Sequence, residues 1–211
     1  APHNPHPITI CDAPVHLCHA SDRGRTPPPG PAAGHAGSGS LDEVTATSPT
    51  ADVLTTSRTE LATTLRRILG PDRVLSEPLE RTLYSRDGSV QIGECGLVAL
   101  PETADEVASC MRAATASGIP VVPRGSGTGL AGSAVPLHDA LVISLSRMNR
   151  ILEIDTETPC AWVEPGVLNL DITTAVSHLG LHYAPDPSSQ QACSIGGNIS
   201  TNAGGPHCLL Y

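Results

Sequence analysis

Residues 121–136, VVPRGSGTGLAGSAVP, restrict the possible folds of this chain more than any other stretch. An apolar, strand-like start leads into a loop that has glycine at positions 125, 127, 129 and 132 and small hydroxyl side chains between them. Because glycine tolerates positive φ, successive backbone N–H groups of such a loop can converge on one anion. The stretch therefore predicts a strand followed by a phosphate-binding loop.

The same glycines satisfy G-x-G-x-x-G, the fingerprint of the Rossmann dinucleotide fold. That fold needs a crossover helix directly after the loop, and such a crossover takes a dozen or more residues. Here Pro136 interrupts the stretch, and the next strand-like run begins already at Ala140. The pattern favours a phosphate loop of another kind over a Rossmann site or a flexible linker.

The rest of the chain alternates between helical and strand periodicities. Apolar spacing predicts amphipathic helices at residues 56–70, 104–117 and 166–180, the second capped by Thr103. Strands are predicted at residues 96–100, 119–122, 140–145, 150–155 and 160–164, the last two as a hairpin. Residues 96–122 thus form a β-α-β unit with the glycine loop at its carboxyl end, where ligands bind in open α/β sheets.

Two further segments lie beside these elements. Arg86 and Asp87 either face a ligand or form a surface turn, and the turn is the favoured interpretation. His178 and His182 lie near a predicted helix end, where histidine more often complements the helix dipole than takes part in catalysis.

Residues 1–50 are rich in Pro, Gly, Ser and His and show no apolar period, so a disordered tail is predicted. Cys11, His16, Cys18 and His19 have the donor atoms of a zinc site, but their spacing fits no common finger. No metal site is therefore predicted.

Composition excludes several classes of protein. The net charge of -9 and the absence of a basic stripe argue against nucleic acid as a partner. Seven cysteines without a C-x-x-C pair are typical of reduced thiols and indicate a cytoplasmic protein. No apolar run is long enough to predict a transmembrane helix.

A second polar, glycine-rich segment covers residues 185–205. More than twenty residues without an apolar strand are rare in a compact domain unless they bind something. Ser194 is placed to cap a short helical turn whose free N–H groups include those of Gly196 and Gly197. This segment is the second candidate for contact with a ligand.

Together the two segments resemble a known family. Three motifs resemble the PCMH-type FAD-binding domain of the vanillyl-alcohol-oxidase superfamily. They are P-R-G-x-G-T-G-L-x-G at 123–132, P-D-P at 185–187 and S-I-G-G-N-I-x-x-N-A-G-G at 194–205. The match is most similar to the FAD-linked subunit of glycolate oxidase and its D-lactate and D-2-hydroxyglutarate dehydrogenase relatives. It spans about residues 56–211 and includes V-A-L-P-E-T at 98–103.

The resemblance implies an α+β fold in which two α/β subdomains hold FAD between them. The expected organisation is a disordered tail at 1–50, a helical segment at 51–93 and an incomplete FAD-binding domain at 94–211 that lacks a cap domain. The implied cofactor-binding residues are Pro123, Arg124, Gly125, Ser126, Gly127, Thr128, Gly129, Gly132, Pro185, Asp186, Pro187, Ser194, Gly197, Asn198, Ser200, Thr201, Gly204 and Gly205.

Roles for these residues follow from the same resemblance. Residues 124–128 and Gly132 would wrap the pyrophosphate, and residues 185–187 would approach the isoalloxazine. The polar side chains at 194–201 would contact the ribityl chain and phosphates, and Gly204 and Gly205 would turn the backbone along the flavin. Relatives with covalent flavin carry His where this chain has Thr128, so noncovalent FAD is implied.

The implied activity is oxidation of a D-2-hydroxy acid such as glycolate or D-lactate, by hydride transfer to flavin N5. In the family a cap domain supplies the base and metal ligands, so no catalytic residue is predicted here and the chain alone is expected to be inactive. An iron–sulfur electron-transfer subunit is an implied partner, through which the protein would lie peripherally at the membrane. The alternative is a flavin-binding module without activity of its own.

Overall fold

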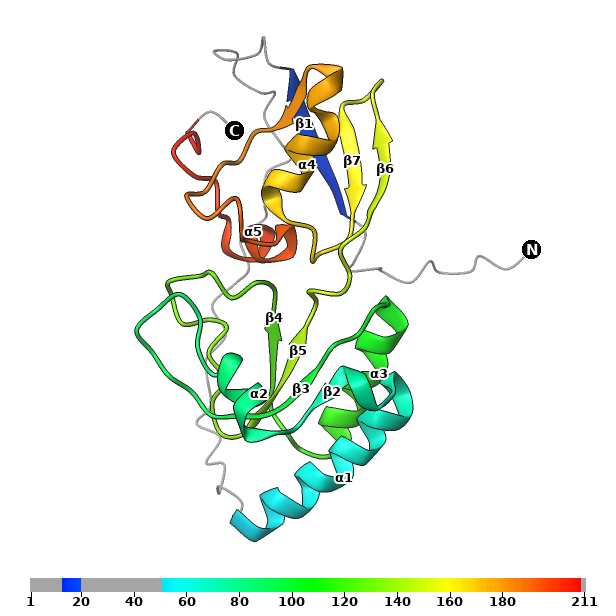
Figure 1. Ribbon diagram of the computed structural model, residues 1–211, viewed down its shortest axis with the longest axis vertical. Coiled ribbons are helices and arrows are strands. Elements are labelled where there is room, and N and C mark those ends of the chain that lie inside the picture. Colours follow the sequence, from blue (N-terminus) through cyan, green and yellow to red (C-terminus); the bar gives the residue numbers. More distant parts are fainter. Residues whose placement is uncertain (1–12, 20–50, 210–211) are drawn as a thin grey trace, which may run out of the picture.

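The computed structural model describes residues 13–19 and 51–209, with side chains from residue 57 onward. It contains two four-stranded sheets, which lie one above the other in Figure 1. The first has strand order β2-β3-β5-β4 and the second has the order β6-β7-β1-β8. The expected α+β fold with two subdomains is confirmed.

The first sheet consists of β2 (Val74–Leu75), β3 (Cys95–Ala99), β4 (Val121–Arg124) and β5 (Ala140–Ser144). β3 and β4 both run parallel to β5, whereas β2 is antiparallel to β3. Because β4 is an edge strand, the missing N–H of Pro123 costs no pairing in the centre of the sheet.

Two helices, α1 (Ala51–Leu69) and α3 (Ala104–Ala116), cover one face of this sheet. Leu61 and Leu65 of α1 and Ala114 of α3 are fully buried in the core that contains Leu97 and Leu141. The amphipathic helix predicted for 56–70 is thus present, and the structure extends it at its amino end. The short elements η2 (Pro71–Arg73) and α2 (Pro78–Leu83) complete this half.

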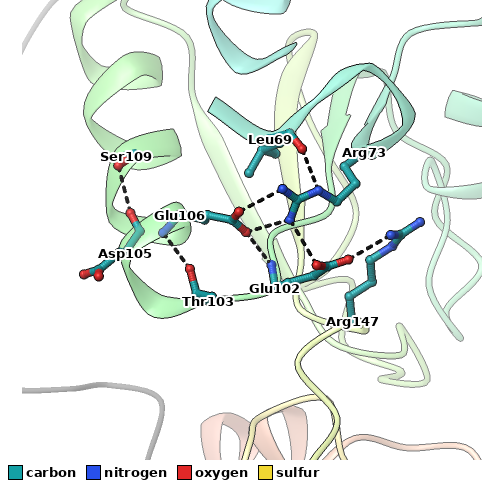
Figure 2. Close-up of polar contacts among 8 residues, drawn as sticks. All are labelled: Leu69, Arg73, Glu102, Thr103, Asp105, Glu106, Ser109 and Arg147. Carbon is teal, nitrogen blue, oxygen red and sulfur yellow. Dashed lines mark hydrogen bonds and ion pairs between the residues drawn. The ribbon is translucent and has the colours of Figure 1, made fainter. Parts of the chain in front are cut away.

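Figure 2 shows the polar cluster that fixes the start of α3. Thr103 Oγ1 accepts a hydrogen bond from Glu106 N at 3.2 Å, which confirms the predicted cap. The guanidinium of Arg73 donates two 2.8 Å hydrogen bonds to the Glu106 carboxylate, and Arg147 donates to Glu102. These contacts join η2, α3 and the segment after β5, and so hold the carboxyl edge of the sheet in place.

The second sheet contains β6 (Ile151–Asp155), β7 (Cys160–Val163), β8 (Leu181–Tyr183) and β1 (Ala13–His19). All its pairings are antiparallel, and the predicted β6–β7 hairpin is confirmed. Helix α4 (Asn169–Val176), followed by η3 (Ser177–Leu179), packs on it through Ile172 and Val176. The predicted single helix at 166–180 is therefore shorter, and β8 follows it.

β1 differs from the disordered tail predicted for residues 1–50. Its backbone lies between β7 and β8, with Val15 opposite Ala161 and Leu17 opposite Tyr183. The remaining residues of that tail lie outside the described part of the chain. Of the described helices, none combines the length and apolar character needed to cross a bilayer.

Helix α5 (Ile195–Thr201) lies at the boundary between the two halves, next to the carboxyl end of β4 (Figure 1). Ile195 is buried in the core of the second half, whereas the helix start faces the glycine loop of the first. The two segments that sequence analysis singled out therefore meet at this boundary.

Candidate cofactor site

The glycine loop begins where β4 ends, at the carboxyl edge of the parallel strands, as predicted. Gly127 and Gly132 have φ values of 71° and 76°, which L side chains rarely adopt. Gly125 packs so closely on Ser194 Oγ that a Cβ atom would overlap that oxygen. The sequence thus uses glycine here both for backbone conformation and for a close approach between the two halves.

Ser126 N donates a 3.3 Å hydrogen bond to Ser194 Oγ and so links the loop to the start of α5. The N–H groups of Gly127, Thr128, Gly129 and Gly197 donate to no acceptor within the described residues. Backbone donors that converge without partners are what an anion-binding loop provides. The loop and the helix start together offer a cradle whose donors suit a pyrophosphate.

Arg124 lies behind this loop. Its Nη1 donates to the carbonyl oxygens of Arg86 at 2.7 Å and Ala134 at 3.4 Å, and its guanidinium lies 5.5 Å from the ring centroid of Tyr84. Burial lowers the pKa of Arg124 from its ordinary value. The Arg124 side chain is thus engaged in contacts with Arg86, Ala134 and Tyr84 of the same chain.

Ser194 occupies the N-cap position of α5, but its side chain makes no capping hydrogen bond because Oγ accepts from Ser126 instead. Gly196 N donates to Pro165 O at 2.9 Å, so of the two glycine amides expected to be free only that of Gly197 is without an acceptor among the described atoms. The helix start thus presents one donor, not two.

Two further residues of α5 use their hydroxyl groups internally. Ser200 Oγ donates to Gly196 O at 2.7 Å, and Thr201 Oγ1 donates to Gly197 O at 2.9 Å. Asn198 differs, since its buried Nδ2 has no hydrogen-bond partner in the described structure. An unpaired buried donor is costly, so Asn198 is the side chain of α5 best suited to an added acceptor.

The predicted P-D-P segment lies against the predicted glycine pair 204–205. Asp186 N donates to Gly204 O at 3.2 Å, and a Cβ atom on Gly205 would overlap the backbone of Asp186. Pro185 O accepts from Asn169 Nδ2 at 3.0 Å. Asp186 Oδ1 is buried and has no partner among the described residues. The two segments therefore pack against each other at Asp186, beyond the end of α5.

Two contributors to this region, His207 and Gly88, are not among the predicted site residues. His207 Nδ1 lies 2.7 Å from Asp186 Oδ2, a contact between residues that no pattern connects. Gly88 faces the glycine loop, where a Cβ atom would lie 2.7 Å from Thr128 O. The turn at Arg86 and Asp87, for which the sequence favours a surface turn over contact with a ligand, thus adjoins the glycine loop through Gly88.

Metal ligands do not gather in the described part of the chain, where no three His, Cys, Asp or Glu side chains come together. The side chains of Cys11, His16, Cys18 and His19 lie outside it. Cys95, Cys110, Cys160, Cys193 and Cys208 are all free thiols. The site is thus built from backbone amides, small side chains and a few polar groups.

An α/β scaffold that presents unpaired amides from a glycine loop and an adjoining helix start is suited to bind the phosphates of a nucleotide. Residues 96–211 match the family model described as FAD binding domain, and the chain belongs to that family. The glycolate oxidase subunit GlcD of Escherichia coli K12 is 49% identical over 115 residues, which are 54% of this chain and 23% of that protein.

Other relatives agree with this assignment. The D-2-hydroxyglutarate dehydrogenase of Xanthomonas citri is 37% identical over 140 residues, 66% of this chain and 30% of that protein. Among solved structures, an alkyldihydroxyacetonephosphate synthase shares the fold with a TM-score of 0.64 at 22% identity, covering 70% of this chain and 32% of that one. The chain thus spans about a quarter to a third of these relatives, and the resemblance inferred from the motifs is confirmed.

Proposed function

We propose that this chain is the FAD-binding part of a flavin-dependent oxidoreductase that oxidises a D-2-hydroxy acid such as glycolate or D-lactate. The observation that carries the proposal is the set of unpaired amides at residues 127–129, in the loop whose Gly125 and Ser126 contact the start of α5 across the boundary between the two halves. Similarity to glycolate oxidase and D-2-hydroxyglutarate dehydrogenase supports the choice of substrate class.

In this proposal the amides of residues 127–129 and Gly197 donate to the pyrophosphate, and Gly132 turns the loop. Asn198 Nδ2 is a buried donor and Asp186 Oδ1 a buried acceptor without partners among the described residues, and the cofactor can form the hydrogen bonds that these two atoms lack. Ser200 and Thr201 contribute only if their hydroxyls leave the helix carbonyls to which they now donate. Thr128 offers no imidazole for a covalent bond, which supports noncovalent FAD.

Bound FAD supplies the hydride acceptor, flavin N5. The substrate loses a hydride from its hydroxyl-bearing carbon and a proton from the hydroxyl, and becomes a 2-oxo acid. The described residues hold and orient the cofactor, and we assign the proton-accepting base to polypeptide outside them. An iron–sulfur subunit that takes the electrons onward, and through it a peripheral position at the membrane, belong to the same proposal.

Two measurements test this function. Purified chain incubated with FAD should show a flavin absorption band after gel filtration, and acid precipitation should release all of that flavin into the supernatant. A chain that retains no flavin would overturn the proposal, and flavin that stays with the precipitate would contradict noncovalent binding.

The reaction itself is tested by anaerobic reduction of the protein that carries this domain. Glycolate or D-lactate should bleach the flavin band, whereas L-lactate should not. A flavin that stays oxidised with every D-2-hydroxy acid would favour the alternative, a flavin-binding module without activity of its own.

A further inference from the structure

We infer that Arg124 is a positioning residue: its guanidinium, held by the segment at residues 84–89, sets the geometry of the glycine loop instead of neutralising the phosphate charge. This inference rests on the proposed FAD site and adds residues 84–89 to it. Neither the motifs nor the relatives assign that segment a role.

The Arg124 side chain points toward the turn after α2. Nη1 is bonded to Arg86 O at 2.7 Å and lies 3.4 Å from Ala134 O, so one nitrogen connects the turn after α2 with the far end of the glycine loop. The guanidinium carbon lies over the Tyr84 ring, 5.5 Å from its centroid, a distance typical of a cation–π contact. The planar fork of arginine makes such a three-sided fit possible, and lysine lacks it.

The guanidinium of Arg124 also lies directly against Gly127. A Cβ atom on Gly127 would overlap the guanidinium, which therefore occupies the space beneath the residue with φ 71°. The guanidinium supports the left-handed turn from which the unpaired amides of residues 127–129 project. Loss of this support would leave the loop free to adopt other conformations that present those amides less well.

The supporting segment at residues 84–89 is itself held in place by hydrogen bonds and close packing. Burial alone would raise the pKa of Asp87, but hydrogen bonds from Ser89 and the backbone of Ala134, with the charge of Arg124, outweigh it and the pKa lies below its ordinary value. Ser89 N donates to Asp87 Oδ1 at 2.8 Å. Gly88 then packs on Thr128 O and Gly129 O, at 2.7 and 3.0 Å from an added Cβ atom.

The turn after α2 and the glycine loop therefore lie back to back, with backbone against backbone at Gly88 and arginine between them. Figure 1 shows both loops on the same side of the first sheet. Because the cradle amides project from the glycine loop, a displacement of this supporting turn changes the cofactor site without any direct contact to the cofactor.

Arg124→Lys and Arg124→Gln separate positioning from charge. If Arg124 acts by positioning the glycine loop, both variants should weaken FAD binding by a similar factor, about tenfold or more. Flavin fluorescence at several salt concentrations measures the affinity. The ³¹P resonances of the pyrophosphate in the remaining bound FAD should shift in both variants, which reports an altered cradle. Arg67→Gln, at an exposed position of α1, is the control and should match wild type.

Retention of wild-type affinity by Arg124→Lys, with loss in Arg124→Gln, would overturn the inference because charge alone would suffice. Unchanged affinity in both would overturn it as well. Should these variants fail to fold, Gly88→Ala gives an independent test, since it should push Thr128 and lower FAD affinity in a folded chain; no effect there also contradicts the inference. Wild-type chain that binds no FAD would instead refute the proposed function itself.

Discussion

The side-chain oxygen of Ser194 accepts its hydrogen bond from the backbone N–H of Ser126, across the boundary between the two sheets of this chain. This oxygen is nearly inaccessible to solvent, because Ser194 is 2% exposed. The bond places the start of α5 beside the glycine loop, and the relative position of the two halves therefore depends in part on one hydroxyl group.

Ser194→Ala should lower the free energy of unfolding by about 0.5 to 1.5 kcal/mol, because Ser126 N loses its acceptor at a buried position. FAD affinity should fall as well, since the two parts of the cradle are no longer held together. Urea denaturation and flavin fluorescence measure the two effects. Thr115→Ala, which removes an exposed hydroxyl group of α3 outside the cradle, is the control. Equal stability of Ser194→Ala and wild type would contradict this prediction.

Gly127→Asp should abolish most FAD binding. The side chain is strained at φ 71°, at a cost of about 1 to 3 kcal/mol, and the carboxylate repels the pyrophosphate. Thr128→Ala should lose much less, about 0.5 to 1.5 kcal/mol if its hydroxyl is bonded to the cofactor. Flavin released by acid ranks the variants.

Gly118→Asp is a matched control for Gly127→Asp. Gly118 also has positive φ, 66°, but a Cβ atom there meets no other atom within 4 Å, and the residue ends α3 outside the cradle. This variant should lose stability and keep FAD affinity. If both aspartate variants retained FAD equally, the glycine loop would not be the cofactor cradle.

The ion pair between Arg73 and Glu106 should make stability depend on acid pH. The hydrogen-bonded Arg73 guanidinium lowers the pKa of Glu106 below its ordinary value of 4.5. This carboxylate therefore contributes stability above pH 4.5, and the contribution is lost as pH falls through the lower folded pKa. Glu106→Gln should be less stable than wild type at pH 7, by about 1 kcal/mol, and the difference should shrink in acid. A difference that does not change between pH 7 and pH 3 would contradict the assignment.

Deletion of residues 1–19 should destabilise the second sheet. β1 pairs with β7 on one side and β8 on the other, so its removal deprives β8 of its described strand partner. We expect a lower melting temperature, and Val15→Pro in the full chain should act in the same direction because proline cannot donate within a central strand. Unchanged melting in both variants would show that β1 is dispensable.

The cysteines should react with thiol reagents in a definite order. Burial raises the pKa of Cys95 and Cys110 to about 11, whereas Cys208 is exposed. Because the thiolate is the reactive form, Cys208 should be labelled at pH 8 well before the other two. Site-resolved mass spectrometry of the native protein follows the order, and labelling of Cys110 together with Cys208 would contradict it.

Local patterns were enough to predict much of the first half. Thr103, the apolar stripe of α3 and Gly118 are sequence neighbours whose effects are short-range, so the helix and its flanking strands could be placed from sequence. The order of the strands could not, since β5 lies between β3 and β4 although both precede it in the chain. That order is decided by packing between distant segments.

The same distinction holds at the site. The glycine loop and the segment containing Ser194 could be found from composition and motif, and the structure brings them together. Gly88 and His207 could not be found, because each acts through a partner far away in sequence, Thr128 and Asp186 respectively. β1 was missed because seven residues amid Pro- and Gly-rich sequence carry too few apolar positions to outweigh their surroundings.

The place of β1 in the second sheet also has a consequence for biosynthesis. A ribosome makes this strand before the whole first sheet, yet its neighbours β7 and β8 are made only after that sheet. The nascent strand has no sheet partner while the first half folds, and it can enter its sheet only after β7 has emerged, with its second neighbour β8 following later. Such a long-range closure is slow, so the second half of this domain should fold after translation of the region is complete, whereas the first half can fold during it.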